Sequence, residues 1–366
     1  MMQQASGEST LSARGASAPR PIAVPPSLAG TPWFSSNAHG PLFRNPWGSP
    51  PIPGPRELIR WRTTKNPFRQ VKRQQRPLPV VEDASTNFES ISSALKALWV
   101  GHATLLFEVD GRRVLVDPIF GRAGGVVARC TAAPVDVAGL PRVDVVCITH
   151  GHHDHLDRRA LRAIAERFGD EVLFAVPLGL ERVLPSACRR VVCFDWWQTL
   201  PIGDGVEIVF VPAQHWHRRG LFDQNRALWG GWVVRGTRAA YHSGDTGYFD
   251  GFSAIGGAVG ALDVAVLPLG AYEPTWFMSS QHMAPECSVR AFDALGARHF
   301  LGMHWGTYDL SDEPIDEGPR RLDALIEGRA DAGRFWVARH GATFSVDSAG
   351  QGALSHRHEH PLRTVD

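Results

Sequence analysis

The chain has 366 residues and a formal net charge of +1, and 43% of its residues are hydrophobic and 20% are charged. This length allows one large domain with additions, or two ordinary domains, with a sizeable core. The near-zero net charge argues against nucleic acid as a partner, and no apolar run of about 18 residues is available to span a membrane. Five cysteines without paired metal-binding spacing favour reduced thiols and a cytoplasmic location, with peripheral contact at a membrane left open.

The chain begins with two segments that lack the pattern of a folded core. Residues 1–55 are rich in Pro, Ser, Gly and Ala, which predicts a disordered or extended arm. Residues 56–94 form a basic lead-in that is expected to be partly helical. We interpret its basic run as a solvated face, with a surface for anionic lipid headgroups as the alternative.

The first half of the main domain is dominated by expected strands. Residues 94–120 contain two β-rich runs joined at Asp110-Gly111, which is the strongest short signal for a hairpin. A buried strand over 143–150 precedes a helix over 157–169, where apolar residues recur at helical spacing and Gly169 ends the helix. Further strands are expected over 172–177, 190–203 and 206–216.

The second half repeats this order of strands followed by a helix. A hairpin with its turn at 235–237 leads into a loop, and Pro285 and Gly296 delimit a helix. The other expected elements are a strand over 262–272, a strand and loop over 299–308, a helix over 317–329 and closing strands over 334–346. The recurrence predicts an α/β (α+β) fold over residues 95–350, an αββα sandwich of two mixed sheets flanked by helices. Residues 351–366 are expected to form a flexible tail.

The run CITHGHHDHLD places four histidines and two aspartates at the end of an apolar strand. His150 and His152 are two positions apart, so their side chains leave an extended chain on the same face and can hold one ion. Asp154 and His155 follow where the chain turns, and they therefore suit a second ion beside the first. His153 lies between these residues and is expected to face away from the ions.

Three further donors follow other apolar stretches. His215 and His304 each come after an expected strand, and Asp245 lies in a Gly-flanked loop where it is well placed to bridge two ions. Imidazole and carboxylate groups are ligands that zinc accepts. The sequence therefore predicts a site for two metal ions, with these ligands: His150, His152, Asp154, His155, His215, Asp245 and His304.

The spacing His-x-His-x-Asp-His at residues 150–155 resembles the signature of the metallo-β-lactamase superfamily. A finer resemblance is to its N-acylphosphatidylethanolamine-hydrolysing phospholipase D branch, over roughly residues 43–310. The motifs that carry it are FRNPWG, WVGHATLLFEVDG, LVDPIF, THGHHDHLD, PAQHWHRRG, HSGDTGYF, LPLGAYEPTWFM, SSQHMAPE and MHWGTY.

This resemblance implies a binuclear zinc phosphodiesterase, with another divalent metal as the alternative native ion. One Zn²⁺ would be held by His150, His152 and His215, and the other by Asp154, His155 and His304, with Asp245 shared. The implied substrate is N-acyl-phosphatidylethanolamine, hydrolysed to N-acylethanolamine and phosphatidic acid by a hydroxide that bridges the ions.

The resemblance also implies roles for three residues in the reaction. Asp154 or Asp245 would hold or accept the proton of the attacking water. His282 corresponds to a histidine near the substrate phosphate, where it would stabilise the phosphoryl oxygens or protonate the leaving group. The alternative for His282 is a cap on the helix that follows it.

The sequence also predicts roles for other residues near the motifs. His102 and Asp117 are expected to be structural or to orient the ligands. Five apolar residues are candidates for lining an acyl groove or lying at a lipid interface, with a place in the core as the alternative: Trp216, Trp229, Trp276, Phe277 and Met278.

Several functions other than phospholipid hydrolysis are compatible with the same fold. A metal-dependent lactonase or a small-molecule phosphodiesterase is the alternative enzyme, and a di-iron redox protein or a non-catalytic lipid-binding relative is a further alternative. A phospholipid is the expected partner, whereas nucleic acid is not. The sequence leaves the oligomeric state open and is compatible with a homodimer.

Overall fold

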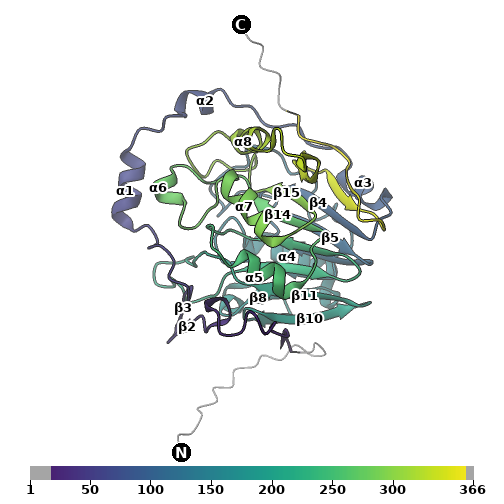
Figure 1. Cartoon of the computed structure of the whole chain (residues 1–366). Helices are drawn as coiled ribbons and strands as arrows, with labels where there is room; N and C mark the ends of the chain where they lie inside the picture. The colour runs from purple at the N-terminus through teal and green to yellow at the C-terminus, as the bar shows by residue number, and fades with distance from the viewer. Residues whose placement is uncertain (1–17, 360–366) are drawn as a thin grey trace, which may run out of the picture.

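Two eight-stranded β-sheets pack face to face and carry helices on their outer faces (Figure 1). The structure is a computed structural model that describes residues 18–359. This layered arrangement confirms the expected αββα sandwich. It follows from strands that are apolar on both faces, because one face can pack on the other sheet while the second is covered by helices.

The first sheet runs antiparallel from β1 to β13 and parallel from β13 to β16. Its order is β1 (Arg20–Pro21), β10 (Gln198–Gly203), β11 (Val206–Val211), β12 (Gly231–Arg235), β13 (Ala239–His242), β14 (Val264–Pro268), β15 (His299–Met303) and β16 (Phe335–Trp336).

The second sheet runs antiparallel from β18 to β6 and parallel from β6 to β9. Its order is β18 (Gly352–Leu354), β17 (Thr343–Val346), β4 (Leu95–Gly101), β5 (Thr104–Val109), β6 (Arg112–Val116), β7 (Val145–Cys147), β8 (Leu173–Pro177) and β9 (Val191–Phe194). The strands β2 (Ala38–His39) and β3 (Leu42–Phe43) form a separate pair.

Helices cover both outer faces, and the first two helices of the lead-in, over residues 55–63 and 69–73, lie apart from the sandwich (Figure 1). The α-helices are α1 (Pro55–Thr63), α2 (Arg69–Arg73), α3 (Ala84–Ser90), α4 (Arg158–Phe168), α5 (Phe252–Val259), α6 (Thr275–Met278), α7 (Pro285–Leu295) and α8 (Glu317–Ile326). The 3-10 helices are η1 (Pro32–Phe34), η2 (Gly169–Glu171), η3 (Leu180–Val183) and η4 (Ala332–Arg334). None of the helices between residues 18 and 359 combines the length and the apolar character needed to cross a bilayer.

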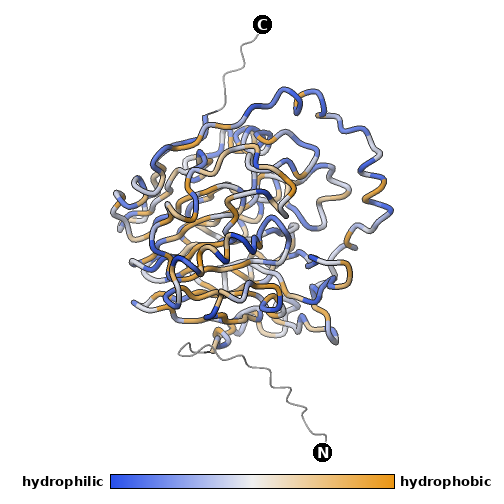
Figure 2. The backbone as a smooth tube through the Cα atoms, turned by 180° about the vertical axis from the view of Figure 1, so that it is seen from behind, coloured by the Kyte–Doolittle hydropathy of each residue, from blue (hydrophilic) through white to orange (hydrophobic). Residues whose placement is uncertain are grey.

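Alternation along the strands separates the core between the sheets from the layer under α3 and α4. On β4, Ala97 and Trp99 face the first sheet, whereas Leu98 and Val100 pack in a cluster with Phe88 of α3. Successive side chains of a strand point to opposite faces, so a continuous apolar run fills both layers. Figure 2 shows the hydrophobic segments running through the sandwich, with hydrophilic segments at its turns and in the lead-in.

Trp232 of β12 is central to the contact between the two sheets. It is fully buried, its ring lies 4.7 Å from that of Phe210 and 4.9 Å from that of Phe194, and its Nε1 donates a hydrogen bond to the carbonyl of Ile148.

We expect Trp232→Ala to lower the free energy of unfolding by about 3–5 kcal/mol, because the substitution leaves a cavity. Urea unfolding measures the loss, and Phe222→Ala at an 88% exposed position is the control. A loss below about 1 kcal/mol would contradict this role.

Two apolar runs that were predicted as continuous are each divided in the structure. Asp110 and Gly111 both have positive φ and form the expected hairpin turn, but β4 and β5 are separated by a second tight turn at His102. The strand predicted over 190–203 is also wrong as a single element. It is split at Trp197, whose φ is +64°, into β9 of one sheet and β10 of the other.

The N-terminal arm lies against the first sheet along part of its length. Ile22 is buried and its N–H donates to the carbonyl of Trp197, and the ring of Phe34 stacks on that of Trp197 at 4.2 Å. Trp47 stacks on Phe249 at 4.9 Å. Residues 18–54 therefore form an extended arm held by aromatic contacts, whereas the prediction for residues 1–17 lies outside the described residues.

The C-terminal segment corrects the expectation of a flexible tail over residues 351–359. β18 pairs with β17 and extends the second sheet, and the ring of His358 packs on that of Trp305 at 4.7 Å. Backbone pairing and ring contact fix this part of the chain, which composition alone does not reveal. Residues 360–366 lie outside the described residues.

Candidate metal centre

The predicted donors meet at one edge of the sandwich, where each follows a strand. His150, His152, Asp154 and His155 follow β7, and the remaining three follow β11, β13 and β15: His215, Asp245 and His304. The carboxyl ends of neighbouring parallel strands lie at the same edge of a sheet, so these loops converge. All seven side chains belong to groups whose potential ligand atoms could share a metal ion.

Three histidines form the first group. His152 Nδ1 lies 2.9 Å from His150 Nε2 and 3.1 Å from His215 Nε2. In a tetrahedral zinc site with Zn–N bonds of about 2.0–2.1 Å, the ligand nitrogens are about 3.3 Å apart. These three nitrogens are therefore arranged to converge on one ion.

The outer nitrogens of His150 and His215 are held by hydrogen bonds that direct the inner ones. His150 Nδ1 donates to Thr149 Oγ1 at 3.0 Å, and Thr149 Oγ1 donates to Asp117 Oδ2 at 2.6 Å. His215 Nδ1 donates to the carbonyl of Gln281 at 3.1 Å. Each of these bonds fixes the tautomer in which Nε2 carries the lone pair that a metal needs.

The second group contains Asp154, His155 and His304, with Asp245 between the two groups. His155 Nε2 lies 3.7 Å from Asp154 Oδ2 and 3.1 Å from Asp245 Oδ2, and His304 Nε2 lies 3.0 Å from Asp245 Oδ1. Asp245 Oδ2 is also 3.9 Å from His150 Nε2 of the first group. The Asp245 carboxylate is thus within reach of both groups, as a bridging ligand requires.

Asp117 orients the second group, as the sequence predicted. Its carboxylate is fully buried, accepts the Nδ1–H of His155 at 2.6 Å, and accepts the N–H of Thr149 at 2.8 Å. The bond leaves His155 Nε2 free to face Asp154 and Asp245. Such carboxylate–histidine pairs commonly fix metal ligands.

Several buried atoms at the site lack any hydrogen-bond partner, although most buried polar groups in proteins have one. They are His155 Nε2, Asp245 Oδ1, His282 Nδ1, His304 Nδ1 and His304 Nε2. A divalent cation would satisfy Asp245 Oδ1 and the facing Nε2 atoms of the two ligand histidines. The donor set therefore fits two metal ions with nitrogen and oxygen ligands.

The charge distribution agrees with this assignment. Burial lowers the pKa of His152 to about 3 and holds those of His150 and His215 well below the usual value, so all three are neutral near pH 7, as metal ligation requires. Burial alone would lower the pKa of His155, but Asp245, Asp154 and Asp117 raise it well above the usual value. The same carboxylates would attract a cation.

His102 orients a ligand of the second group, as the sequence predicted. Its Nε2 donates to Asp154 Oδ2 at 3.0 Å, and its ring lies 3.9 Å from that of His304. Burial and His304 lower the pKa of His102 to about 3, so it is a neutral donor that orients the Asp154 carboxylate. The only sequence signal was a histidine beside a glycine at a tight turn.

Glycine between the two histidines of the first group is a packing requirement. A Cβ on Gly151 would lie 2.2 Å from Cε1 of His217, which is buried beneath the loop. His153 belongs to neither metal group, as predicted, and its Nε2 lies 3.2 Å from the carbonyl of Arg219. The residues after β11 thus support the loop after β7.

A cavity of about 400 Å³ opens onto the metal groups. Its polar lining is His152, His153, Asp154, Asp245, His282 and His304, and its apolar lining includes Ala123, Val126, Val127, Met278 and Leu310. His282 Nδ1 lies 3.8 Å from Asp245 Oδ2. His282 makes no side-chain cap on α7, so the alternative of a helix cap is wrong.

The apolar residues predicted near the substrate are divided among three environments. Met278 lines the cavity, and the ring of Trp216 lies 4.9 Å from that of His152. Trp276 and Phe277 do not line this cavity, because Trp276 is 41% exposed beneath Arg60 of α1 and Phe277 packs on the lead-in. Trp229 is part of the core.

Comparison with known proteins relates this chain to metal-dependent hydrolases. A family model described as a β-lactamase superfamily domain matches residues 112–305. The N-acyl-phosphatidylethanolamine-hydrolyzing phospholipase D 1 of Caenorhabditis elegans is 33% identical over 317 residues, which cover 80% of this chain and 88% of that protein. A metal-dependent hydrolase of Pyrobaculum aerophilum is 30% identical over 233 residues, covering 63% of this chain and 93% of that protein.

Solved structures share the fold at lower sequence identity. A possible metal-dependent hydrolase from Veillonella parvula superimposes with a TM-score of 0.55 at 15% identity, covering 69% of this chain and all of that one. A metallo hydrolase from Ignicoccus hospitalis superimposes with a TM-score of 0.51 at 21% identity, covering 73% of this chain and 99% of that one. These similarities concern the fold alone.

Proposed function

The chain belongs to the metallo-β-lactamase superfamily of metal-dependent hydrolases, and we propose that it is a binuclear zinc phosphodiesterase that hydrolyses N-acyl-phosphatidylethanolamine. The bond that breaks joins phosphorus to the oxygen of the N-acylethanolamine headgroup. Water supplies a hydroxyl group to phosphorus and a proton to the leaving oxygen, so the products are phosphatidic acid and an N-acylethanolamine.

The observation that carries this proposal is the mixed lining of the cavity. The lining combines the metal-facing groups and His282 with apolar residues that include Val127, Met278 and Leu310. An amphiphile with a phosphodiester next to alkyl chains fits such a site, because the lining offers contacts to both its charged and its apolar parts. The similarity to the phospholipase D 1 of Caenorhabditis elegans over most of both chains supports the same substrate class.

The residues are divided between two zinc ions in the proposal. His150, His152 and His215 would hold one ion, and the second group would hold the other: Asp154, His155 and His304, with Asp245 shared. When bound, such a pair of ions lowers the pKa of a water molecule and neutralises charge on a phosphoryl oxygen.

The chain's own residues orient the water and the substrate. Burial alone would raise the pKa values of Asp154 and Asp245, but neighbouring histidines hold both well below the usual range. Both side chains are therefore ionised and can accept a hydrogen bond from the attacking water. His102 fixes one of these carboxylates, and His282 faces the space where the phosphoryl group would lie.

A substrate panel with metal analysis tests the proposal. We expect purified protein to contain two zinc ions per chain and to release N-acylethanolamine and phosphatidic acid from N-acyl-phosphatidylethanolamine in mixed micelles. Acyl lactones and bis-p-nitrophenyl phosphate, assayed in parallel, should be hydrolysed much more slowly. Faster hydrolysis of a lactone or of the small diester would overturn the lipid assignment, and iron with redox activity but no hydrolysis would overturn the zinc reaction.

A further inference from the structure

Two loops beside the cavity expose apolar side chains at their tips. Val126 of the loop 122–127 is 72% exposed, and Leu221 and Phe222 of the loop 217–226 are 78% and 88% exposed. Single exposed apolar residues need no explanation, but several on one face mark an interaction surface. The two loops can therefore form one interaction surface if their tips lie on the same face of the protein.

The loop 217–226 holds its shape through its own hydrogen bonds. The N–H of Asn225 donates to the carbonyl of His217 at 2.7 Å, and Asp223 Oδ1 accepts the N–H groups of Arg219 and Gly220 at 3.1 and 2.7 Å. A loop closed in this way presents its tip in one conformation. The exposure of Leu221 and Phe222 is thus built into the loop.

A groove of about 580 Å³ near both loops is lined by arginines. Among residues 18–359 no acidic side chain forms an ion pair with any of the four that line it: Arg122, Arg158, Arg159 and Arg219. The two acids at the groove, Asp136 and Asp157, accept the backbone N–H groups of Gly139 and Arg159, and the four arginines outnumber them. The groove therefore offers guanidinium groups to an external anion.

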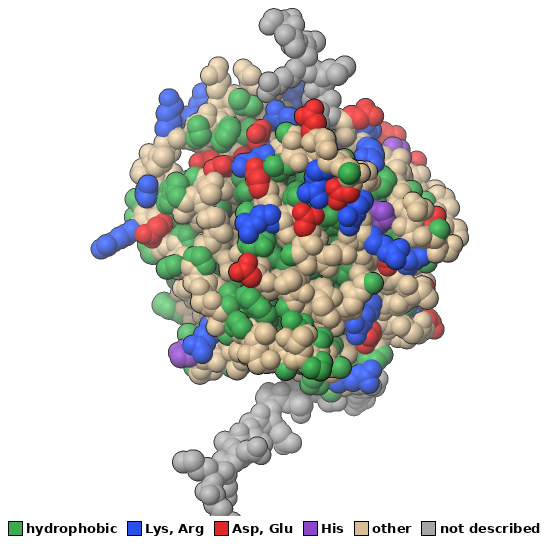
Figure 3. All heavy atoms as spheres, viewed as in Figure 1, with side chains coloured by type: hydrophobic (Ala, Val, Ile, Leu, Met, Phe, Trp, Pro, Cys, Tyr) green, Lys and Arg blue, Asp and Glu red, His purple; other side chains and the backbone are tan. Residues whose placement is uncertain are grey.

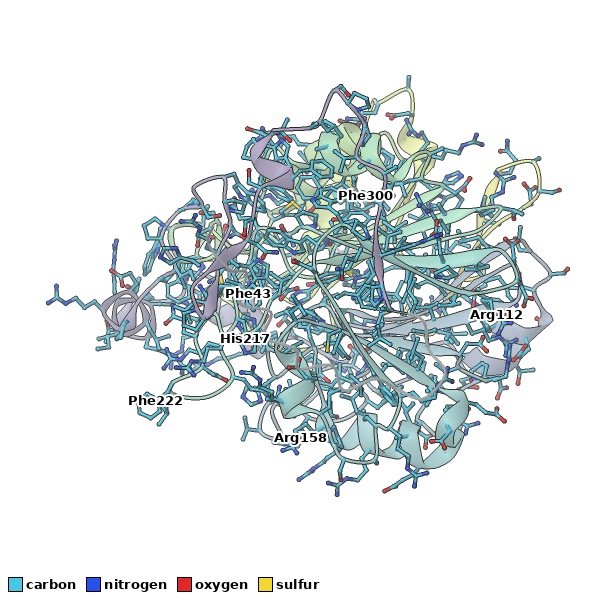
Figure 4. The ribbon with its side chains drawn as sticks, turned by 90° about the horizontal axis from the view of Figure 1, so that it is seen from below. Phe43, Arg112, Arg158, His217, Phe222 and Phe300 are labelled. Carbon is cyan, nitrogen blue, oxygen red and sulfur yellow. The ribbon has the colours of Figure 1, made fainter. Side chains whose placement is uncertain are left out.

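The loops, the groove and the cavity form one continuous surface. Gly124 and His153 line both the groove and the cavity, and the N–H of Gly124 donates to the carbonyl of His153. On the other side, His153 contacts the carbonyl of Arg219, whose guanidinium donates to the carbonyl of Gly151. Figure 4 shows Phe222 at the tip of its loop, directed away from the body of the protein, with Arg158 on the same lower side of the view.

We propose that this surface, which we name the docking face, binds a lipid bilayer that carries anionic headgroups. The docking face consists of the loops 122–127 and 217–226 and the arginine groove. Leu221, Phe222 and Val126 enter the boundary between headgroups and acyl chains, and the guanidinium groups contact lipid phosphates. The cavity mouth, which Val126 lines, is then held at the membrane surface.

Charge and apolar tips together favour a bilayer over other partners. Apolar tips flanked by arginines match the order of acyl chains and phosphates at a bilayer surface. A second copy of the chain matches less well, since a two-fold contact would bring the same arginine groove against itself. On the face drawn in Figure 3, by contrast, Lys and Arg are interspersed with Asp and Glu.

Vesicle binding by the full chain tests this inference without any substrate lipid. We expect the wild type to sediment with phosphatidylcholine vesicles that contain phosphatidylglycerol and to bind pure phosphatidylcholine more weakly. Replacing both apolar tips, Leu221→Ser with Phe222→Ser, should weaken binding by roughly tenfold or more. Reversing charge with Arg158→Glu and Arg159→Glu should remove the preference for anionic vesicles, since each arginine contributes roughly fivefold.

Matched substitutions elsewhere serve as controls. Val24→Ser alters an exposed apolar residue of the N-terminal arm, and Arg189→Glu alters an arginine that pairs with Asp170 beyond the far end of α4. Both should bind vesicles like the wild type, and the tip variant should keep full hydrolysis of a soluble phosphodiester. The inference is overturned if the wild type does not bind anionic vesicles or if the tip variant binds unchanged. It is also overturned if inorganic phosphate alone occupies the groove, or if the tip variant converts a dimer to a monomer.

Discussion

Asp245→Asn is expected to lower kcat/KM for phosphodiester hydrolysis by roughly 10³-fold or more and to reduce bound metal below two ions per chain. Among residues 18–359, Asp245 is the one acidic residue whose carboxylate lies within 4.0 Å of histidine nitrogens from both metal groups, at 3.1 and 3.0 Å from His155 and His304 and at 3.9 Å from His150. An amide of the same shape carries no charge and has a single oxygen acceptor, so it cannot bridge two cations. Steady-state kinetics and metal analysis on the same preparation measure both effects.

A buried aspartate outside the site provides the matched control. Asp263 is 7% exposed and pairs with Arg238, so Asp263→Asn should reduce stability while leaving two ions and full turnover. His304→Ala should reproduce the Asp245→Asn phenotype, because neither ring nitrogen of His304 has a hydrogen-bond partner whose loss would disturb the fold. Full activity with two bound ions in either site variant would show that the residue is not a ligand.

The architecture could be predicted because its signals are local. The hairpin at Asp110-Gly111 needs two residues that tolerate positive φ, and α4 and α7 each end at a glycine that continues the chain in a non-helical conformation. Such features are set by a few neighbouring residues. The order of strands and helices, and hence the layered fold, follows from them.

The missed features depend on contacts between distant segments. The crossing at Trp197 was hidden because both sheets accept the same apolar residues. The turn is marked by the φ of +64° at Trp197 and by the packing of Phe34, which is distant in the chain, on that residue. α5 was missed because Gly256 and Gly257 interrupt an otherwise apolar run with little periodicity. Whether a strand changes sheet or a short apolar segment forms a helix is decided by tertiary packing.

The candidate site shows the same division between local and distant information. All seven predicted donors lie at the expected edge, because a metal site requires particular side chains at particular strand ends. Spacing did not reveal that His102 contacts Asp154, which is 52 positions away in the chain. Nor did it reveal that α6 turns Met278 toward the cavity and Trp276 toward α1. Side-chain direction in a helix of one turn depends on what the helix packs against.

His282→Ala is expected to lower kcat by roughly 10²–10³-fold while both metal ions are retained. His282 lines the cavity, and its Nδ1 lies 3.8 Å from Asp245 Oδ2 without a hydrogen-bond partner. Burial lowers the pKa of His282 to about 4 against the opposing effect of Asp245, so the ring is neutral near pH 7. A neutral imidazole still donates one N–H, which favours stabilisation of a phosphoryl oxygen over protonation of the leaving group.

The conservative variant His282→Gln separates these two roles. Glutamine keeps an N–H donor but cannot deliver a proton, so partial recovery of kcat relative to His282→Ala supports the hydrogen-bond role. Equal loss in both variants would favour proton transfer to the leaving alkoxide. His299→Ala is the matched control, because His299 lies at the start of β15 and bonds to the carbonyl of Gly350, away from the cavity. Loss of an ion from His282→Ala would instead identify His282 as a ligand, since Asp245, His282 and His304 can also share one metal ion.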